Sequence, residues 1–173
     1  MVHVVEEHPP EGEEGVDWKL VTTEPIETPE DIERVVDFYR ARWLIEEFFK
    51  ALKSGCDFEG RQLETRAALL NALALFSAVA WRLLLLRSLA YEHSDEPAEE
   101  ALTEVQLKIL RRESKRVPLG VSVTARDAYL AIAGLRRHLK RNGEPGWQTL
   151  GRGFEDLLQF ERGWALHEED SAM

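Results

Sequence analysis

The sequence predicts a mainly α fold in which a short N-terminal β-hairpin is followed by a helical C-terminal domain. Two observations support this prediction. Two short segments rich in β-branched and aromatic residues precede residue 28, and helix start signals with apolar residues at helical spacing dominate from there on. The composition, with 44% hydrophobic and 31% charged residues, is that of a globular protein rather than a disordered one.

The hairpin is predicted from residues 2–5 and 18–22, which are connected by a long loop with two prolines and two glycines. Two strands alone do not make a stable sheet. We therefore expect the hairpin to be the remaining edge of a larger sheet.

Five helices are predicted after the hairpin. The first runs from residue 28 to about residue 53, because Thr28 is a favoured cap, Pro29 suits the first turn, and Ser54-Gly55 ends the pattern. The other four are expected at about residues 65–90, 103–112, 124–141 and 146–164. The last of them has an apolar stripe that we expect to form a dimer contact, while its glycines should weaken it; the stripe contains Trp147, Leu150, Phe154, Leu157, Leu158 and Phe160.

The charge of the chain is unevenly distributed. The net charge is −10, yet residues 106–141 hold ten basic and two acidic residues, a local charge of +8. Because DNA affinity comes largely from cations at phosphates, the acidic total does not exclude DNA but confines any contact to a patch. A solvated helix face explains the basic segment equally well; its clustered cations are Arg111, Arg112, Lys115, Arg116, Arg136, Arg137, Lys140 and Arg141.

Neither a disulfide nor a membrane span is expected. Cys56 is the single cysteine, which favours a reducing, cytoplasmic compartment. The longest apolar stretch, residues 67–86, is interrupted by Asn71, Ser77 and Arg82. These polar interruptions favour a buried helix over a membrane-spanning one, and no membrane partner is expected.

The first predicted helix carries four functional side chains at regular spacing. Tyr39 is followed by Arg42, Glu46 and Lys53, at offsets of 3, 7 and 14. In an α-helix these positions fall within roughly 60° of one another. A charged stripe of this kind is also what any surface helix shows. The opposite side is apolar and is expected to be a core stripe, formed by Phe38, Leu44, Ile45, Phe48, Phe49 and Leu52.

The pattern Tyr-x2-Arg-x3-Glu-x6-Lys resembles the signature of the insertion-sequence-4 group of bacterial transposases. The flanking sequence is similar as well: residues 18–26 look like the last sheet segment of that family, and residues 42–50 look like its RWxIEExxK stretch. Glu59 and residues 61–64, 128–133 and 145–147 also match. The resemblance implies a ribonuclease-H-like catalytic core, of which the hairpin is a remnant.

The resemblance also implies roles for individual residues. Glu46 would be the third carboxylate of a site that holds two Mg²⁺ or Mn²⁺ ions, which prefer oxygen ligands. Tyr39, Arg42 and Lys53 would contact DNA phosphates. Trp18 would stack on an extruded base, as in hairpin-forming relatives, although a half-buried sheet tryptophan is an equally good interpretation.

We therefore expect the C-terminal portion of a DNA transposase that is incomplete alone, because the family's two catalytic aspartates lie upstream of this sequence. Residues 1–64 would be the end of the catalytic core, and residues 65–173 a helical domain for dimerisation and DNA contact. The expected partners are transposon-end DNA and a second transposase chain, in a homodimer or in a heterodimer with full-length transposase. The alternative is a non-catalytic dimerisation module or an inhibitor of transposition.

Overall fold

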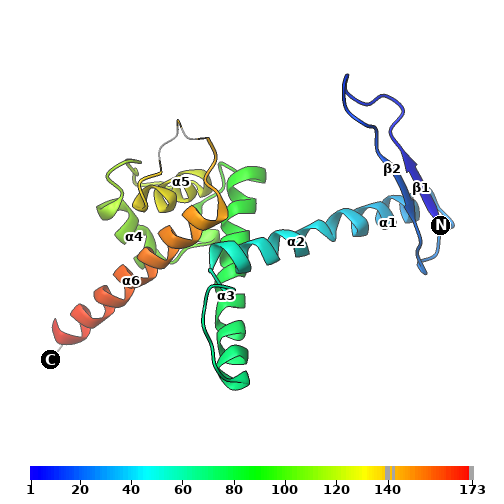
Figure 1. The fold of residues 1–173 in the computed structure, drawn as a ribbon. Helices are drawn as coiled ribbons and strands as arrows, with labels where there is room; N and C mark the ends of the chain where they lie inside the picture. Colours follow the sequence, from blue (N-terminus) through cyan, green and yellow to red (C-terminus); the bar gives the residue numbers. More distant parts are fainter. Residues whose placement is uncertain (139–140, 142, 172–173) are drawn as a thin grey trace. The chain divides into compact units, whose positions relative to one another are not determined.

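A computed structural model describes residues 1–138, 141 and 143–171, with side chains as far as residue 167 (Figure 1). The chain divides into two compact units, Met1–Glu47 and Phe48–Met173. The predicted fold class is confirmed: an antiparallel hairpin is followed by helices alone within the described residues. The predicted functional division between residues 64 and 65 stays a prediction.

The first unit contains the hairpin and helix α1. Strands β1 (Val2–Val5) and β2 (Asp17–Leu20) are antiparallel, with Val2 opposite Leu20 and Val4 opposite Trp18. Helix α1 (Pro29–Ala41) packs on the hairpin through a small core of Val2, Leu20 and Val35. Because only one helix covers two short strands, this core is far smaller than that of the second unit.

The start of α1 is fixed by a capping box. The Thr28 hydroxyl accepts a hydrogen bond from the Asp31 backbone N–H at 3.2 Å, and the Asp31 carboxylate accepts one from the Thr28 N–H at 3.1 Å. A hydrogen bond from the backbone of Glu27, and then one from Arg34, hold the pKa of Asp31 below its usual value. The sequence-based start at Thr28 is confirmed.

The prediction of one continuous α-helix from residue 28 to residue 53 is wrong. Helix α1 ends at Ala41, a turn at Arg42 leads into α2 (Trp43–Lys50), and residues Ala51–Gly55 form a π-helix, η1. The interruption at Arg42 is mild, since this residue keeps helical backbone angles and donates its N–H to Phe38 O at 3.2 Å. The π-helix is the larger departure, because its i→i+5 bonds change the angular spacing of side chains.

The apolar side of this segment is also not the core stripe that the pattern predicted. Phe38, Leu44 and Ile45 are exposed, whereas Leu52 is buried inside the second unit. A hairpin of two strands has too little surface to cover an apolar helix face.

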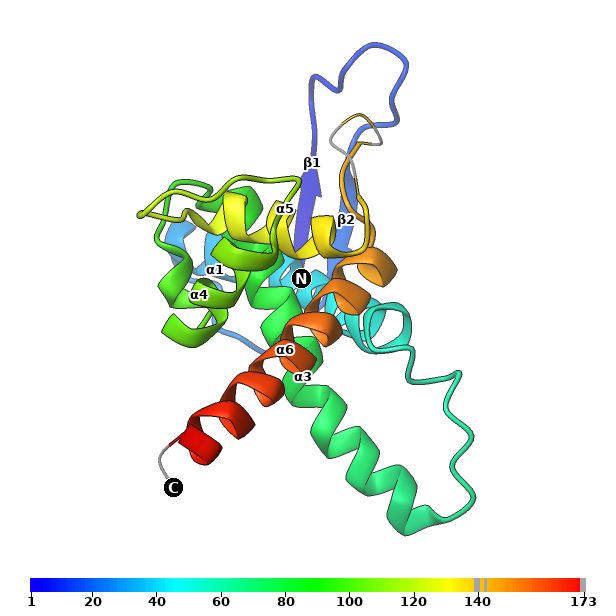
Figure 2. The same cartoon turned by 90° about the vertical axis from the view of Figure 1, so that its left-hand side faces the viewer.

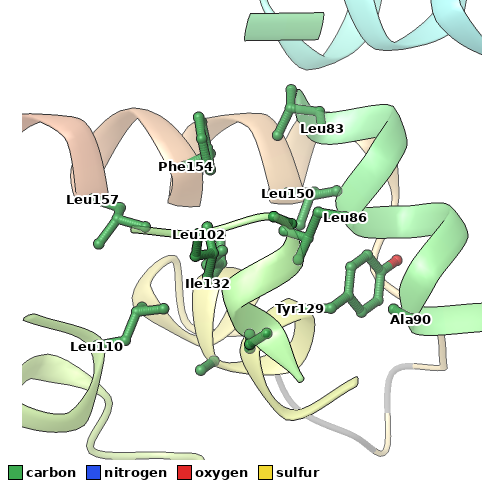
Figure 3. Packing of buried hydrophobic residues seen from close by; sticks show 14 of the residues in the cluster. Leu83, Leu86, Ala90, Leu102, Leu110, Tyr129, Ile132, Leu150, Phe154 and Leu157 are labelled. Atoms are coloured by element: carbon green, nitrogen blue, oxygen red, sulfur yellow. The ribbon is translucent and has the colours of Figure 1, made fainter. Parts of the chain in front are cut away.

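The second unit is a bundle in which α5 (Ala125–Leu135) and the second half of α3 (Arg66–Glu92) form the centre. Helices α4 (Glu104–Glu113) and α6 (Trp147–Ser171) pack around this centre, together with η1 and the 3₁₀ turn η2 (Ala98–Glu100). Figure 3 shows side chains of α3, α4, α5 and α6 meeting in one cluster. The four helices predicted after residue 64 are thus confirmed, although α5 ends earlier than predicted and α6 runs farther.

Helix α3 has two halves with different environments. Its C-terminal half lies in the bundle, whereas its N-terminal half extends past the other helices of the unit (Figure 2). The exposed side chains of that first half include Leu69, Leu70, Leu73 and Leu75. By length and composition, α3 is the one helix among the described residues that could span a membrane. Within its C-terminal half, five residues are buried in the bundle.

Arg82 interrupts the apolar sequence of α3 because it binds a buried glutamine. Its guanidinium donates to Gln106 Oε1 at 2.8 Å and to Ala101 O at 3.2 Å. The amide of Gln106 donates in turn to Glu161 Oε2 at 2.7 Å. This network connects α3, α4 and α6 and satisfies the polar atoms that burial would otherwise leave unpaired.

The apolar stripe on α6 is part of this core and not an open dimer surface. Leu150, Phe154 and Leu157 are at most 1% exposed and pack against the other helices of the same chain. The sequence pattern showed that one face of α6 must be covered, but it did not show that α3, α5 and η1 cover it. An association through this face is therefore corrected to intrachain packing.

Candidate functional site

Arg42 and Glu46 form the centre of the candidate site in the first unit. Arg42 stands at the turn between α1 and α2, and Glu46 lies one helical turn later in α2. Arg42 Nη1 donates to Glu46 Oε1 at 3.2 Å, and both side chains remain partly exposed. One guanidinium donor therefore orients the Glu46 carboxylate, while the other donors of Arg42 remain available for a second acceptor.

Tyr39 and Trp18 continue this set of contacts toward the hairpin. The Arg42 guanidinium lies 5.6 Å from the centre of the Tyr39 ring, within cation–π range. The Tyr39 ring is tilted against Trp18, with 4.9 Å between the ring centres. Trp18 on β2 is partly buried. The structure thus brings Trp18, Tyr39, Arg42 and Glu46 together. Trp18 is half-buried in the hairpin, which is one of the two interpretations that its sequence position allowed.

A hollow of about 480 Å³ opens beside these residues, between the end of β2 and α1. Tyr39 and Arg42 line it together with the exposed side chains of Val21 and Phe38. A guanidinium, a phenol and apolar surface around one depression can hold a phosphate and an adjoining flat group. The sequence did not single out Val21 or Phe38 for this role, because they become neighbours only where β2 meets α1.

Lys53 is in a different environment from the other members of the motif. It belongs to η1 in the second unit and forms an ion pair with Glu59, with 3.1 Å between Nζ and Oε1. The calculation that aligned Lys53 with Tyr39 assumed uninterrupted α-helix, and the π-helix removes that basis. A DNA-binding role for Lys53 stays a prediction.

The described residues do not by themselves fit a pair of divalent metal ions. Among them, no group of three or more His, Cys, Asp or Glu side chains is placed to hold a metal. Glu46 is paired with a cation, Arg42, and a two-metal site needs several carboxylates around the ions. A metal site at Glu46 requires further ligands.

Comparison with known protein families gives a match over the N-terminal part of the chain. Residues 5–82 match the family model described as Transposase DDE domain. The matched stretch contains Trp18, Tyr39, Arg42, Glu46 and Lys53, so strand β2 and the motif lie within the same match. This part of the chain is therefore similar to the DDE domain of transposases, the class of protein that carries out DNA transposition and recombination. The match does not specify the insertion-sequence-4 group.

The basic residues of the segment 106–141 fall into two groups: some bind other groups of the same chain, and others line surface hollows. Arg111 donates to the carbonyl oxygens of Gly120 and Val121, and Arg136 pairs with Asp156, so these two cations hold loops and helices together. Lys140 lies outside the described residues. Four other cations line two hollows near Phe160: Arg112, Lys115, Arg116 and Arg137.

Cys56 is expected to be unreactive in the folded chain. Burial raises the pKa of its thiol to about 11, with Arg61 opposing and Glu155 adding to the shift. Since a thiolate is the nucleophile, the raised pKa should slow alkylation at pH 8 by about 100-fold relative to the unfolded chain. The rate of iodoacetamide labelling, measured with and without urea, tests this. Equal rates in both states would contradict it, and the single cysteine ensures that only one thiol is measured.

Proposed function

We propose that this chain is the C-terminal portion of an insertion-sequence-4-type DNA transposase, in which Glu46 supplies one carboxylate of the DNA-cleaving site. The observation that supports this most is the contact series from Trp18 through Tyr39 and Arg42 to Glu46, all within the matched segment. A chain with this role acts on transposon-end DNA, which in bacteria lies in the cytoplasm.

Each residue would have a distinct task. Arg42 would hold Glu46 through one donor and a DNA phosphate through its remaining donors, and Tyr39 would donate its phenolic hydrogen to the same phosphate. Trp18 would present a ring face to an unpaired base. Mg²⁺ or Mn²⁺, when bound by Glu46 together with carboxylates that the described residues do not provide, would stabilise the attacking and leaving oxygens.

The exposed apolar face of α1 and α2 supports the view that more protein surrounds this segment. Phe38 is 57% exposed, and Leu44 and Ile45 are exposed to a similar degree. Contiguous apolar surface of this kind usually contacts other protein. A larger sheet beside the hairpin would cover it, as a ribonuclease-H-like core requires.

The first test is cleavage of DNA. The 173-residue chain alone is expected not to nick plasmid DNA with Mg²⁺ or Mn²⁺, because Glu46 cannot assemble the metal pair. When the chain is joined to an upstream segment with the two missing aspartates, Glu46→Gln should reduce cleavage by more than about 100-fold and leave DNA binding within about twofold. Glu33→Gln, an exposed carboxylate on α1, is the matched control and should cleave normally. Metal-dependent nicking by the chain alone, abolished by Glu46→Gln, would overturn the proposal.

A second candidate function is that of a non-catalytic dimerisation module or an inhibitor of transposition. In either role the chain would bind full-length transposase. The exposed leucines on the first half of α3 favour it, since apolar helix surface of this kind suits a partner helix. Leu70→Glu should then abolish co-purification with full-length transposase. Unchanged co-purification would contradict this second candidate function.

A further inference from the structure

Two adjoining hollows form a groove along α4, the end of α5 and α6. Their volumes are about 380 Å³ and 230 Å³, and both are lined by Glu113 and Phe160. We call this surface the basic–aromatic groove and define it by six residues: Arg112, Lys115, Arg116, Arg137, Phe160 and Trp164. It lies entirely within the second unit, and the candidate site at Glu46 belongs to the first.

The groove has an excess of available positive charge. Among the described residues, the side chains of its four cations have no ion-pair or hydrogen-bond partner, whereas Lys108 pairs with Glu104 and Arg136 with Asp156. Two acids line the groove, Glu113 and Asp156, and the second is neutralised by Arg136 at 2.6 Å. Four free cations against one free carboxylate favour a polyanion, although the chain as a whole carries −10.

Arg137 occupies a backbone conformation that glycine would adopt more easily. Its φ is 64°, and it ends α5 with Arg137 N–H bonded to Gly134 O and His138 N–H to Ala133 O. This is the C′ position of a Schellman motif, where glycine is the usual residue. An arginine here places a guanidinium in the groove at the expense of backbone stability, which points to a task for its charge.

Two aromatic rings lie between these cations. Phe160 is 44% exposed at the junction of the two hollows, and the partly buried Trp164 lines the smaller one. An exposed ring flanked by cations offers a stacking surface for a base whose neighbouring phosphates contact the charges. A base pair inside a duplex presents only its edges, so the ring favours single-stranded nucleic acid.

We propose that the basic–aromatic groove binds single-stranded DNA, with Lys115, Arg116 and Arg137 on phosphates and an unpaired base on Phe160. The choice of DNA over RNA rests on the proposed transposase function. The phosphate and stacking contacts rest on the groove alone.

The test is fluorescence anisotropy of the full chain with a labelled DNA strand, its duplex and an RNA strand of the same sequence. Lys115→Ala and Arg116→Ala should each weaken single-strand binding and lower the slope of log K against log salt by about 0.7. Lys108→Ala removes the same charge from the paired lysine of α4 and should change neither quantity. If Lys108→Ala weakens binding as much as Lys115→Ala, the binding is diffuse and the groove is not a site.

Two further variants separate the contacts. Phe160→Leu keeps an apolar side chain without a ring face and should weaken single-strand binding by about 5- to 100-fold, with duplex binding unchanged. Arg137→Gly should weaken DNA binding while raising the thermal midpoint, because it relieves the left-handed backbone. A loss of binding with a lowered midpoint would indicate that Arg137 is structural.

Other outcomes identify other occupants. Tighter binding of the RNA strand overturns the assignment to DNA. Salt-sensitive self-association without DNA, abolished by Lys115→Glu, would mean that the acidic N-terminal segment of a second copy occupies the groove. Cleavage is tested separately, with the chain joined to the upstream segment. If that joined wild-type protein fails to cleave DNA while the groove still binds a single strand, only the transposase proposal is contradicted.

Discussion

Gly153→Ala is expected to destabilise the second unit by about 3 kcal/mol and to lower its thermal midpoint by about 6–12 °C. A Cβ at this position would overlap the backbone carbonyl of Ile132 in α5, and one at Gly151 would overlap the carbonyl of Gly55 in η1. Because backbone atoms cannot rotate away as a side chain does, α6 would have to move off both neighbours. Gly151→Ala should therefore act similarly, and the double variant should not fold.

The matched control is Gly163→Ala on the same helix, where an added Cβ meets no atom within 4 Å. This variant should be as stable as the wild type or more stable by up to about 1 kcal/mol, since alanine favours helix. Circular dichroism melting of the three single variants compares them directly. Equal midpoints for Gly153→Ala and Gly163→Ala would show that the close helix approach is absent.

Phe154→Glu is expected to unfold the second unit rather than to dissociate a dimer. Phe154 is 1% exposed and lies among α3 and α5 side chains in the core (Figure 3). Truncation of such a phenylalanine costs about 3–5 kcal/mol, and a buried unpaired carboxylate adds to that loss. The variant should lack cooperative thermal unfolding and expose apolar surface that binds a hydrophobic dye.

Phe160→Glu, six residues farther along α6, is the control, because its ring is 44% exposed. It should keep a cooperative melt near the wild-type midpoint. If Phe154→Glu instead yields a folded monomer from a wild-type dimer in sedimentation, the face is an interface and the core assignment is wrong.

Local signals in the sequence specified the elements well. Thr28, Thr65, Thr103 and Thr124 each accept a backbone hydrogen bond at the start of a helix, as their residue type favours. The same local reasoning failed at residues 51–53, where Ala, Leu and Lys favour an α-helix and the structure has a π-helix. That conformation depends on packing between η1, α3 and α6, which residue propensities do not encode.

The site was predicted in part. The spacing of Tyr39, Arg42 and Glu46 is local, and the structure keeps these three in contact through the turn at Arg42. Trp18 came from family resemblance, and its contact with Tyr39 depends on how β2 packs on α1. The sequence indicates the cations of the basic–aromatic groove as one candidate for a DNA-contact patch, but it does not predict Phe160 beside them, because Phe160 and Lys115 are distant in sequence.

The sequence by itself determined where helices begin, which side of α6 is apolar, and that Tyr39, Arg42 and Glu46 follow one another along one segment. Those features depend on neighbours within a few residues, so the local sequence contains the information. Only the tertiary structure decided what covers each apolar face: α6 is buried in its own unit, while Phe38 and the first half of α3 are exposed. It also explains why residues 151 and 153 are glycines. The backbone of α6 passes close to the backbones of Gly55 and Ile132 there, and this approach exists only in the folded chain.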